Sequence, residues 1–98
     1  MGRLRLSQGA QQDLIEIRQY SIVEFGTDVA DAYFRGFNQS FALLHARPFC
    51  GALQPEIAPD VRCFVHRRHR IFYCVQDDLV LILRIIHHAR NARRALLP

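Results

Sequence analysis

Lysine is absent from this sequence, in which all 13 basic residues are arginine. This absence excludes reactions that need a lysine amine, such as Schiff-base chemistry, and the lysine of a phosphate-binding P-loop. The five glycines are scattered, so a Gly-rich loop that could hold a phosphate is missing too. The three cysteines form an odd number, which argues against a closed disulfide framework and favours a reduced, cytoplasmic setting.

Long apolar runs are missing as well. The longest, Leu79–Ile86, has eight residues and contains Arg84, whereas a membrane-spanning helix needs about 20 apolar residues. The N-terminal residues lack the apolar core of a signal peptide. Half of the residues are nevertheless apolar, which excludes a wholly disordered chain, and 98 residues fit a single domain over 1–98. We therefore expect one folded domain that does not bind a membrane.

Acidic residues are scarce in the second part of the chain. Residues 1–60 contain five Arg and seven Asp or Glu, for a net charge of −2. Residues 61–98 contain eight Arg and only two Asp, for a net charge of +6, together with four of the five His. Such a segment attracts an anionic partner, either nucleic acid or an acidic protein. A solvated basic face would explain the charge equally well, so the charge alone leaves the function open.

A first helix is predicted over residues 10–25, where apolar side chains recur at helical spacing. Ser7 is placed to cap its N-terminus, because a serine hydroxyl can accept a hydrogen bond from a free backbone N–H. Gly26 is placed to end it, because glycine tolerates a positive φ.

A second helix is predicted from Thr27 or Asp28, either of which could cap it, to about Ala46, before Pro48. Its apolar stripe extends over four turns and comprises Ala30, Tyr33, Phe34, Phe37, Phe41 and Leu44. Four aromatic side chains could stack on bases, but their spacing favours packing against a core. Two helices joined by so short a connection form an antiparallel hairpin.

Strands are predicted on both sides of the hairpin. Arg3–Leu6 alternates polar and apolar residues. After a loop over residues 48–60, three β-rich segments follow: Val61–Arg67, Arg70–Val75 and Leu79–His87. The connections between them are too short for crossovers, so they form an antiparallel meander. The predicted fold is α+β: an N-terminal strand and a helix hairpin packed on a three- to four-stranded, antiparallel-rich sheet, whose other face is wet or covered by a partner.

The sequence gives little support for a metal site or for the active site of a hydrolase. The Cys-x-x-Cys spacing of structural zinc sites is absent, and residues three apart on a strand, such as Cys63 and His66, point to opposite faces. We therefore expect neither a metal nor a cofactor. The sequence has no Gly-x-Ser-x-Gly nucleophile motif and no paired carboxylates near its histidines. Metal-free RNA cleavage by histidine and arginine side chains stays open.

Two motifs late in the chain are the most specific in the sequence: His69-Arg70-Ile71-Phe72-Tyr73-x-Val75 and Leu83-Arg84-Ile85-Ile86-His87-x-Ala89-Arg90. With the order of elements, they resemble the ParE toxins of bacterial type II toxin–antitoxin systems, within the RelE/ParE superfamily. The resemblance spans almost the whole chain. It implies a RelE/ParE-like fold and a non-enzymatic toxin that poisons DNA gyrase.

The resemblance also implies the partners and where they bind. A ParD-like antitoxin with a DNA-binding ribbon-helix-helix domain neutralises the toxin in a hetero-oligomer and makes the only contact with operator DNA. The surface facing gyrase is expected to include Arg70, Arg84, His87, Arg90, Arg93, Arg94, Leu96 and Leu97. The antitoxin is expected to bury apolar surface and to pair carboxylates with arginine. The residues expected to contact it are Leu14, Arg62, Phe64, Tyr73 and Arg84.

A second branch of the superfamily, the RelE ribonucleases that cut messenger RNA on the ribosome, is the alternative. Arg70 and Arg90 match two basic positions of that branch. Its two lysine positions and its tail tyrosine position fall near non-basic residues: Val61, Cys63 and Leu96. The gyrase-poison branch is therefore favoured, although some histidines of the basic half could substitute, namely His66, His87 and His88. A plain nucleic-acid-binding module is a third hypothesis.

Overall fold

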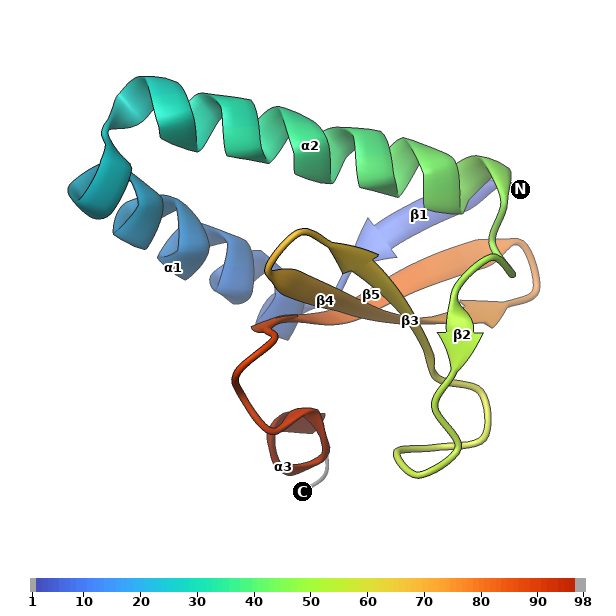
Figure 1. Cartoon of the computed structure of the whole chain (residues 1–98). Coiled ribbons are helices and arrows are strands. Elements are labelled where there is room, and N and C mark those ends of the chain that lie inside the picture. The colour runs from blue at the N-terminus through green and yellow to red at the C-terminus, as the bar shows by residue number, and fades with distance from the viewer. Residues whose placement is uncertain (1, 97–98) are drawn as a thin grey trace.

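The computed structural model describes residues 2–96 as two long helices, a five-stranded sheet and a short C-terminal helix (Figure 1). The elements in chain order are β1 (Arg3–Leu6), α1 (Gln8–Phe25), α2 (Thr27–Ala46), β2 (Ala52–Leu53), β3 (Arg62–His66), β4 (His69–Gln76), β5 (Leu79–His87) and α3 (Ala92–Leu96). The predicted α+β class and helix hairpin are confirmed, and the three meander strands agree with the predicted ones to within one residue at each end.

The sheet has the strand order β1-β5-β4-β3-β2. Strands β2 to β5 pair with one another in antiparallel fashion, whereas β1, at the edge opposite β2, lies parallel to β5. The parallel pair needs a crossover, which the helix hairpin and the meander supply. The sheet has one strand more than the three to four expected. The additional strand is β2, in which Ala52 and Leu53 pair with Cys63 and Arg62 inside the segment predicted to be a loop.

The two helix ends at the hairpin tip depend on Gly26. Its φ of 87° ends α1 as predicted, and its backbone N–H donates to the carbonyl of Ile22. At the other end of α1, the Ser7 hydroxyl accepts from the amide of Ala10 at 3.0 Å, so that cap is confirmed. The predicted side-chain cap of α2 is wrong, because Gly26 also takes the N-cap position and makes no side-chain hydrogen bond. Asp28 instead lies in the first turn, where its carboxylate faces the positive end of the helix dipole.

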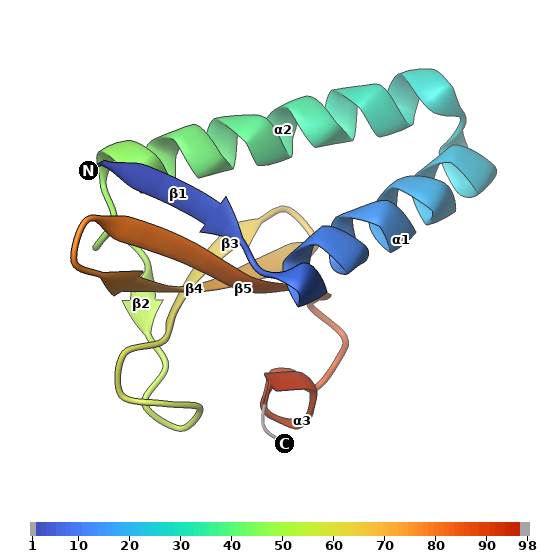
Figure 2. The same ribbon diagram turned by 180° about the vertical axis from the view of Figure 1, so that it is seen from behind.

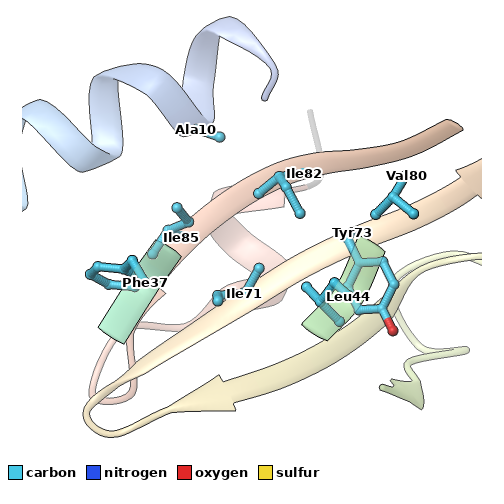
Figure 3. Close-up of a cluster of buried hydrophobic side chains, with 8 residues drawn as sticks. All are labelled: Ala10, Phe37, Leu44, Ile71, Tyr73, Val80, Ile82 and Ile85. Atoms are coloured by element: carbon cyan, nitrogen blue, oxygen red, sulfur yellow. The ribbon is translucent and has the colours of Figure 1, made fainter. Parts of the chain in front are cut away.

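The main core lies between the helix hairpin and one face of the sheet (Figure 3). Its buried side chains are Ala10, Phe37, Leu44, Ile71, Tyr73, Val80, Ile82 and Ile85. The aromatic stripe of α2 packs into this core, with Tyr33 and Phe37 in edge-to-face contact at 5.2 Å between ring centroids. The stripe therefore stabilises the fold and is not a platform for bases. Each large side chain buried in this way contributes about 1.5–3 kcal/mol.

A second, smaller core covers part of the opposite face of the sheet. Phe72 and Ile86 are fully buried there, together with Val61 and Ala92. The segment before β3 and helix α3 both lie on this side, away from the hairpin (Figure 2). The face predicted to be wet or covered by a partner is thus partly covered by the chain itself. Within residues 2–96, no helix is long and apolar enough to cross a membrane.

Candidate functional site

Arg84 and Asp13 form an ion pair at the point where β5 continues beyond the end of β1. Arg84 Nε and Nη2 donate to the two carboxylate oxygens of Asp13 at 2.8 and 2.9 Å. The same carboxylate accepts from the backbone amide of Ile85 at 2.8 Å. Asp13 is only 5 % exposed, and these bonds offset the cost of burying its charge. Donating hydrogen bonds to the Asp13 carboxylate also raises the pKa of Arg84 above its ordinary value.

Two strand arginines bind carbonyl oxygens of the segment that follows β5. Arg84 uses its third guanidinium nitrogen, Nη1, to donate to the carbonyl of Ala95 at 3.1 Å. Arg70 Nη2 donates to the carbonyl of Arg90 and lies 3.5 Å from that of His88. Both guanidinium groups, expected to face gyrase, are therefore engaged in holding the C-terminal segment.

Exposed arginines line the end of the sheet next to this segment. The two-residue turn between β3 and β4 consists of Arg67 and Arg68, and the carbonyl of Arg68 accepts from the amide of His88 at 2.8 Å. This bond brings the turn next to the segment that carries Arg90, Arg93 and Arg94. We call these five exposed side chains the arginine band: Arg67, Arg68, Arg90, Arg93 and Arg94. In residues 2–96, the ion pairs involve other arginines, so the band keeps its charge available to an anionic partner.

The remaining residues expected to face gyrase differ in exposure. His87 is half-buried, and its ring lies 4.4 Å from that of His88. Leu96 is half-buried against the second core, so it anchors α3. Leu97 lies outside the described residues. An open hollow next to α3 is lined by Arg90, Asn91, Arg94 and Ala95.

The residues expected to contact the antitoxin do not form one surface. Leu14 belongs to α1, which packs over β5, whereas Arg62 and Phe64 are on β3, two strands away. Leu14 and Phe64 are half-buried against the main core. Tyr73 is 0 % exposed, and its hydroxyl accepts from the Gly51 amide at 2.8 Å. Its expected place on a binding surface is corrected: β4 is the central strand, covered on both faces, so Tyr73 has no surface to offer a partner.

Arg62 lies at the β2–β3 edge with exposed apolar neighbours. Its Nη1 donates to the carbonyls of Gly51 and Phe49 at 2.8 and 3.1 Å, and its guanidinium lies 5.2 Å from the centre of the Phe49 ring. Leu53 pairs with Arg62 across the two strands. The side chains of Phe49 and Leu53 are 62 % and 51 % exposed. This edge combines apolar surface with a positive charge.

Three histidines lie side by side on neighbouring strands, because His69 pairs with His66 on β3 and with His87 on β5. The Tyr33 hydroxyl is 2.7 Å from Nδ1 of His69. Burial, with the neighbouring histidines, lowers the pKa of His69 to about 4. His66 packs 4.7 Å from the Phe37 ring, and burial lowers its pKa too. These two histidines therefore support the packing of α2 on the sheet.

The histidine row limits the ribonuclease alternative. His66, one of its candidate acid–base groups, is packed so closely against α2 that a Cβ added at Gly36 would come within 2.4 Å of its ring. His87 and His88 remain nearer the surface. Among residues 2–96, no three His, Cys, Asp or Glu side chains are placed to hold a metal ion.

Asp13 is the residue that the sequence analysis missed. It lies three residues after Ala10 and four before Ile17, on the apolar side of α1. A carboxylate at such a position must find a buried partner, and that placement is the signal that could have identified it.

Comparison with known proteins agrees with this architecture. The model of the ParE toxin family of type II toxin–antitoxin systems, parDE, matches residues 4–92. The chain belongs to the ParE toxin family. It is 30 % identical over 89 residues to Toxin ParE1 of Caulobacter vibrioides, covering 91 % of this chain and 92 % of that protein. It is also 30 % identical over 95 residues to Toxin ParE1 of Mycobacterium tuberculosis, covering 96 % and 97 %.

A solved structure supports the same family assignment. A chain of the chromosomal ParDE toxin–antitoxin system from P. aeruginosa superimposes with a TM-score of 0.77 at 25 % identity, over 89 % of this chain and 96 % of that one. The family resemblance inferred from the sequence is thereby confirmed, and the chain is a toxin of a type II toxin–antitoxin system.

Proposed function

We propose that this ParE-family toxin inhibits DNA gyrase by binding it and is not an enzyme. The observation that carries the proposal is the arginine band, which presents five exposed guanidinium groups on one end of the sheet and on the C-terminal segment. Arg70 and Arg84 hold that segment by its backbone carbonyls. A fixed, charged surface suits binding to a large, DNA-loaded target, because pre-ordered groups lose less entropy when they bind.

A ParD-like antitoxin is the proposed partner that neutralises the toxin in a hetero-oligomer. The P. aeruginosa relative comes from a ParDE toxin–antitoxin system, which supports a toxin–antitoxin complex here. The β2–β3 edge around Arg62 fits an antitoxin segment with apolar side chains and carboxylates. We propose that Leu14 and Phe64 contribute apolar contacts from their half-buried positions. The antitoxin's ribbon-helix-helix domain would make the contact with operator DNA. Toxin, antitoxin and gyrase would meet in the cytoplasm.

The test is a supercoiling assay with purified gyrase, relaxed plasmid and ATP. We expect the toxin to block supercoiling and to leave cleaved plasmid after protein denaturation, and the antitoxin to reverse both effects. A parallel reaction contains ribosomes and messenger RNA. Gyrase left untouched, together with messenger RNA cut on the ribosome, would overturn the proposal in favour of the ribonuclease alternative.

A further inference from the structure

The Asp13–Arg84 pair contacts the C-terminal segment in a way that restricts its position. A planar guanidinium held by two parallel hydrogen bonds to one carboxylate cannot rotate. Asp13 makes both of these bonds to Nε and Nη2 of Arg84, so the direction of Nη1 is also set. Nη1 is the atom that donates to the carbonyl of Ala95. Through Arg84, a residue of α1 therefore determines where the C-terminal helix can dock.

Helix α3 depends on such contacts. It has five residues, and a helix of this length is not stable by itself in water. Asn91, just before the helix, caps its first turn: its Oδ1 accepts from the Arg94 amide at 3.1 Å, and its carbonyl accepts from the Ala95 amide at 3.2 Å. Ala92 and Leu96 pack on the second core. Arg84 bonds the helix itself at the carbonyl of Ala95, and Arg70 holds the residues before the helix at the carbonyl of Arg90.

The docked orientation of α3 decides which side chains it exposes. Ala92 and Ala95 face the sheet, so Arg93 and Arg94 are left on the outside. If the helix were released, these guanidinium groups would sample many positions, and binding would have to order them again. The hydrogen bond from Arg84 to Ala95 therefore helps to set the positions of Arg93 and Arg94 in the arginine band.

We propose that Asp13 and Arg84 are positioning residues of the toxin: they hold the C-terminal helix in the orientation in which Arg93 and Arg94 meet gyrase. This inference rests on the proposed function, because it assumes that the arginine band contacts gyrase. It differs from the expectation that Arg84 itself touches a partner, since here Arg84 acts through the backbone of Ala95.

The first test uses Arg84→Lys. Lysine keeps a positive charge opposite Asp13, but its single amine cannot bond the carboxylate twice and reach Ala95 as well. We expect trypsin cleavage after Arg93 and Arg94 to become about tenfold faster than in the wild type, because one charge-assisted hydrogen bond is lost. Cleavage after Arg35, which is exposed on α2, serves as the internal reference. The concentration for half-inhibition of gyrase should rise about tenfold.

The matched control is Asp31→Asn. Asp31 pairs with Arg18 at 2.7 Å between α1 and α2, and this pair makes no contact with the C-terminal segment. Both trypsin cleavage and gyrase inhibition should stay within twofold of the wild type. Should Arg84→Lys lower the melting temperature of the whole protein markedly, Asp13→Asn replaces it. This variant keeps the size of the side chain and weakens both bonds to Arg84, so it should change both readouts in the same direction.

The outcomes separate this inference from the proposed function. Faster cleavage with unchanged gyrase inhibition overturns the positioning role, and so does weaker inhibition with unchanged cleavage, which would mean direct contact by Arg84. Unchanged values of both also overturn it. A wild-type toxin that does not affect gyrase overturns the proposed function and the gyrase half of this inference, whereas the trypsin result still tests how α3 is held.

Discussion

Tyr73→Phe should destabilise the toxin without changing its affinity for the antitoxin. The Tyr73 hydroxyl is buried and accepts a hydrogen bond from the Gly51 amide at 2.8 Å. Removing the hydroxyl leaves that amide without this partner at a site closed to water. A buried donor left unsatisfied costs about 1–3 kcal/mol, and we expect the free energy of unfolding to fall by this amount. Packing of the ring is retained, so no cavity is added.

The assay is urea denaturation followed by fluorescence or circular dichroism, with thermal melting in parallel. A loss of 1 kcal/mol lowers the melting temperature of a domain of this size by about 4–8 °C. The matched control is Tyr20→Phe, since Tyr20 is exposed on α1 and its change should stay within about 0.5 kcal/mol. Wild-type stability for Tyr73→Phe would refute the reasoning. A tenfold loss of antitoxin affinity at unchanged stability would show that Tyr73 contacts the partner after all.

Three further predictions concern the surface and the histidine row. Removing residues 93–98 should abolish gyrase inhibition, because two guanidinium groups of the arginine band are lost. The affinity for the antitoxin should stay largely intact. Unchanged killing by the truncated toxin would count against this role of the C-terminal residues. Arg62→Ala should weaken antitoxin binding about tenfold in a titration, since a charge-assisted pair is lost, while Arg35→Ala on exposed α2 should not. In the folded protein the pKa of His69 is lowered to about 4, so the unfolded chain binds a proton at this histidine more readily than the folded protein does. The free energy of unfolding should therefore fall as the pH drops from about 6.5 to 4. Urea titrations at several pH values should show this dependence become flatter in His69→Gln.

Most of the fold could be predicted because its signals are local. The stripe of α2 from Ala30 to Leu44 repeats every three or four residues, and only a helix places such residues on one face. The short connections between the last three strands exclude crossovers, so an antiparallel meander could be predicted for them. Strand β2 was missed because two residues show no periodicity, and it exists only by pairing with Arg62 and Cys63.

The site was predictable only in part. Charge counting located the basic half, and three members of the arginine band, Arg90, Arg93 and Arg94, were expected at the surface and lie there. The position of Tyr73 was predicted wrongly because a strand pattern alone does not tell which side chains of the sheet the helices cover. Its side chain lies in the main core, where the helix hairpin covers the sheet.

By itself, the sequence determined the class of fold, the hairpin, the meander and the family, since these depend on spacing and on motifs along the chain. Only the tertiary structure decided what the arginines do. Asp13 and Arg84 are 71 residues apart, and no local pattern couples them. Folding brings them together because α1 packs over the end of β5, where a buried carboxylate requires a cation. The structure thereby divides the basic charge between arginines that hold the C-terminal segment and arginines that remain exposed.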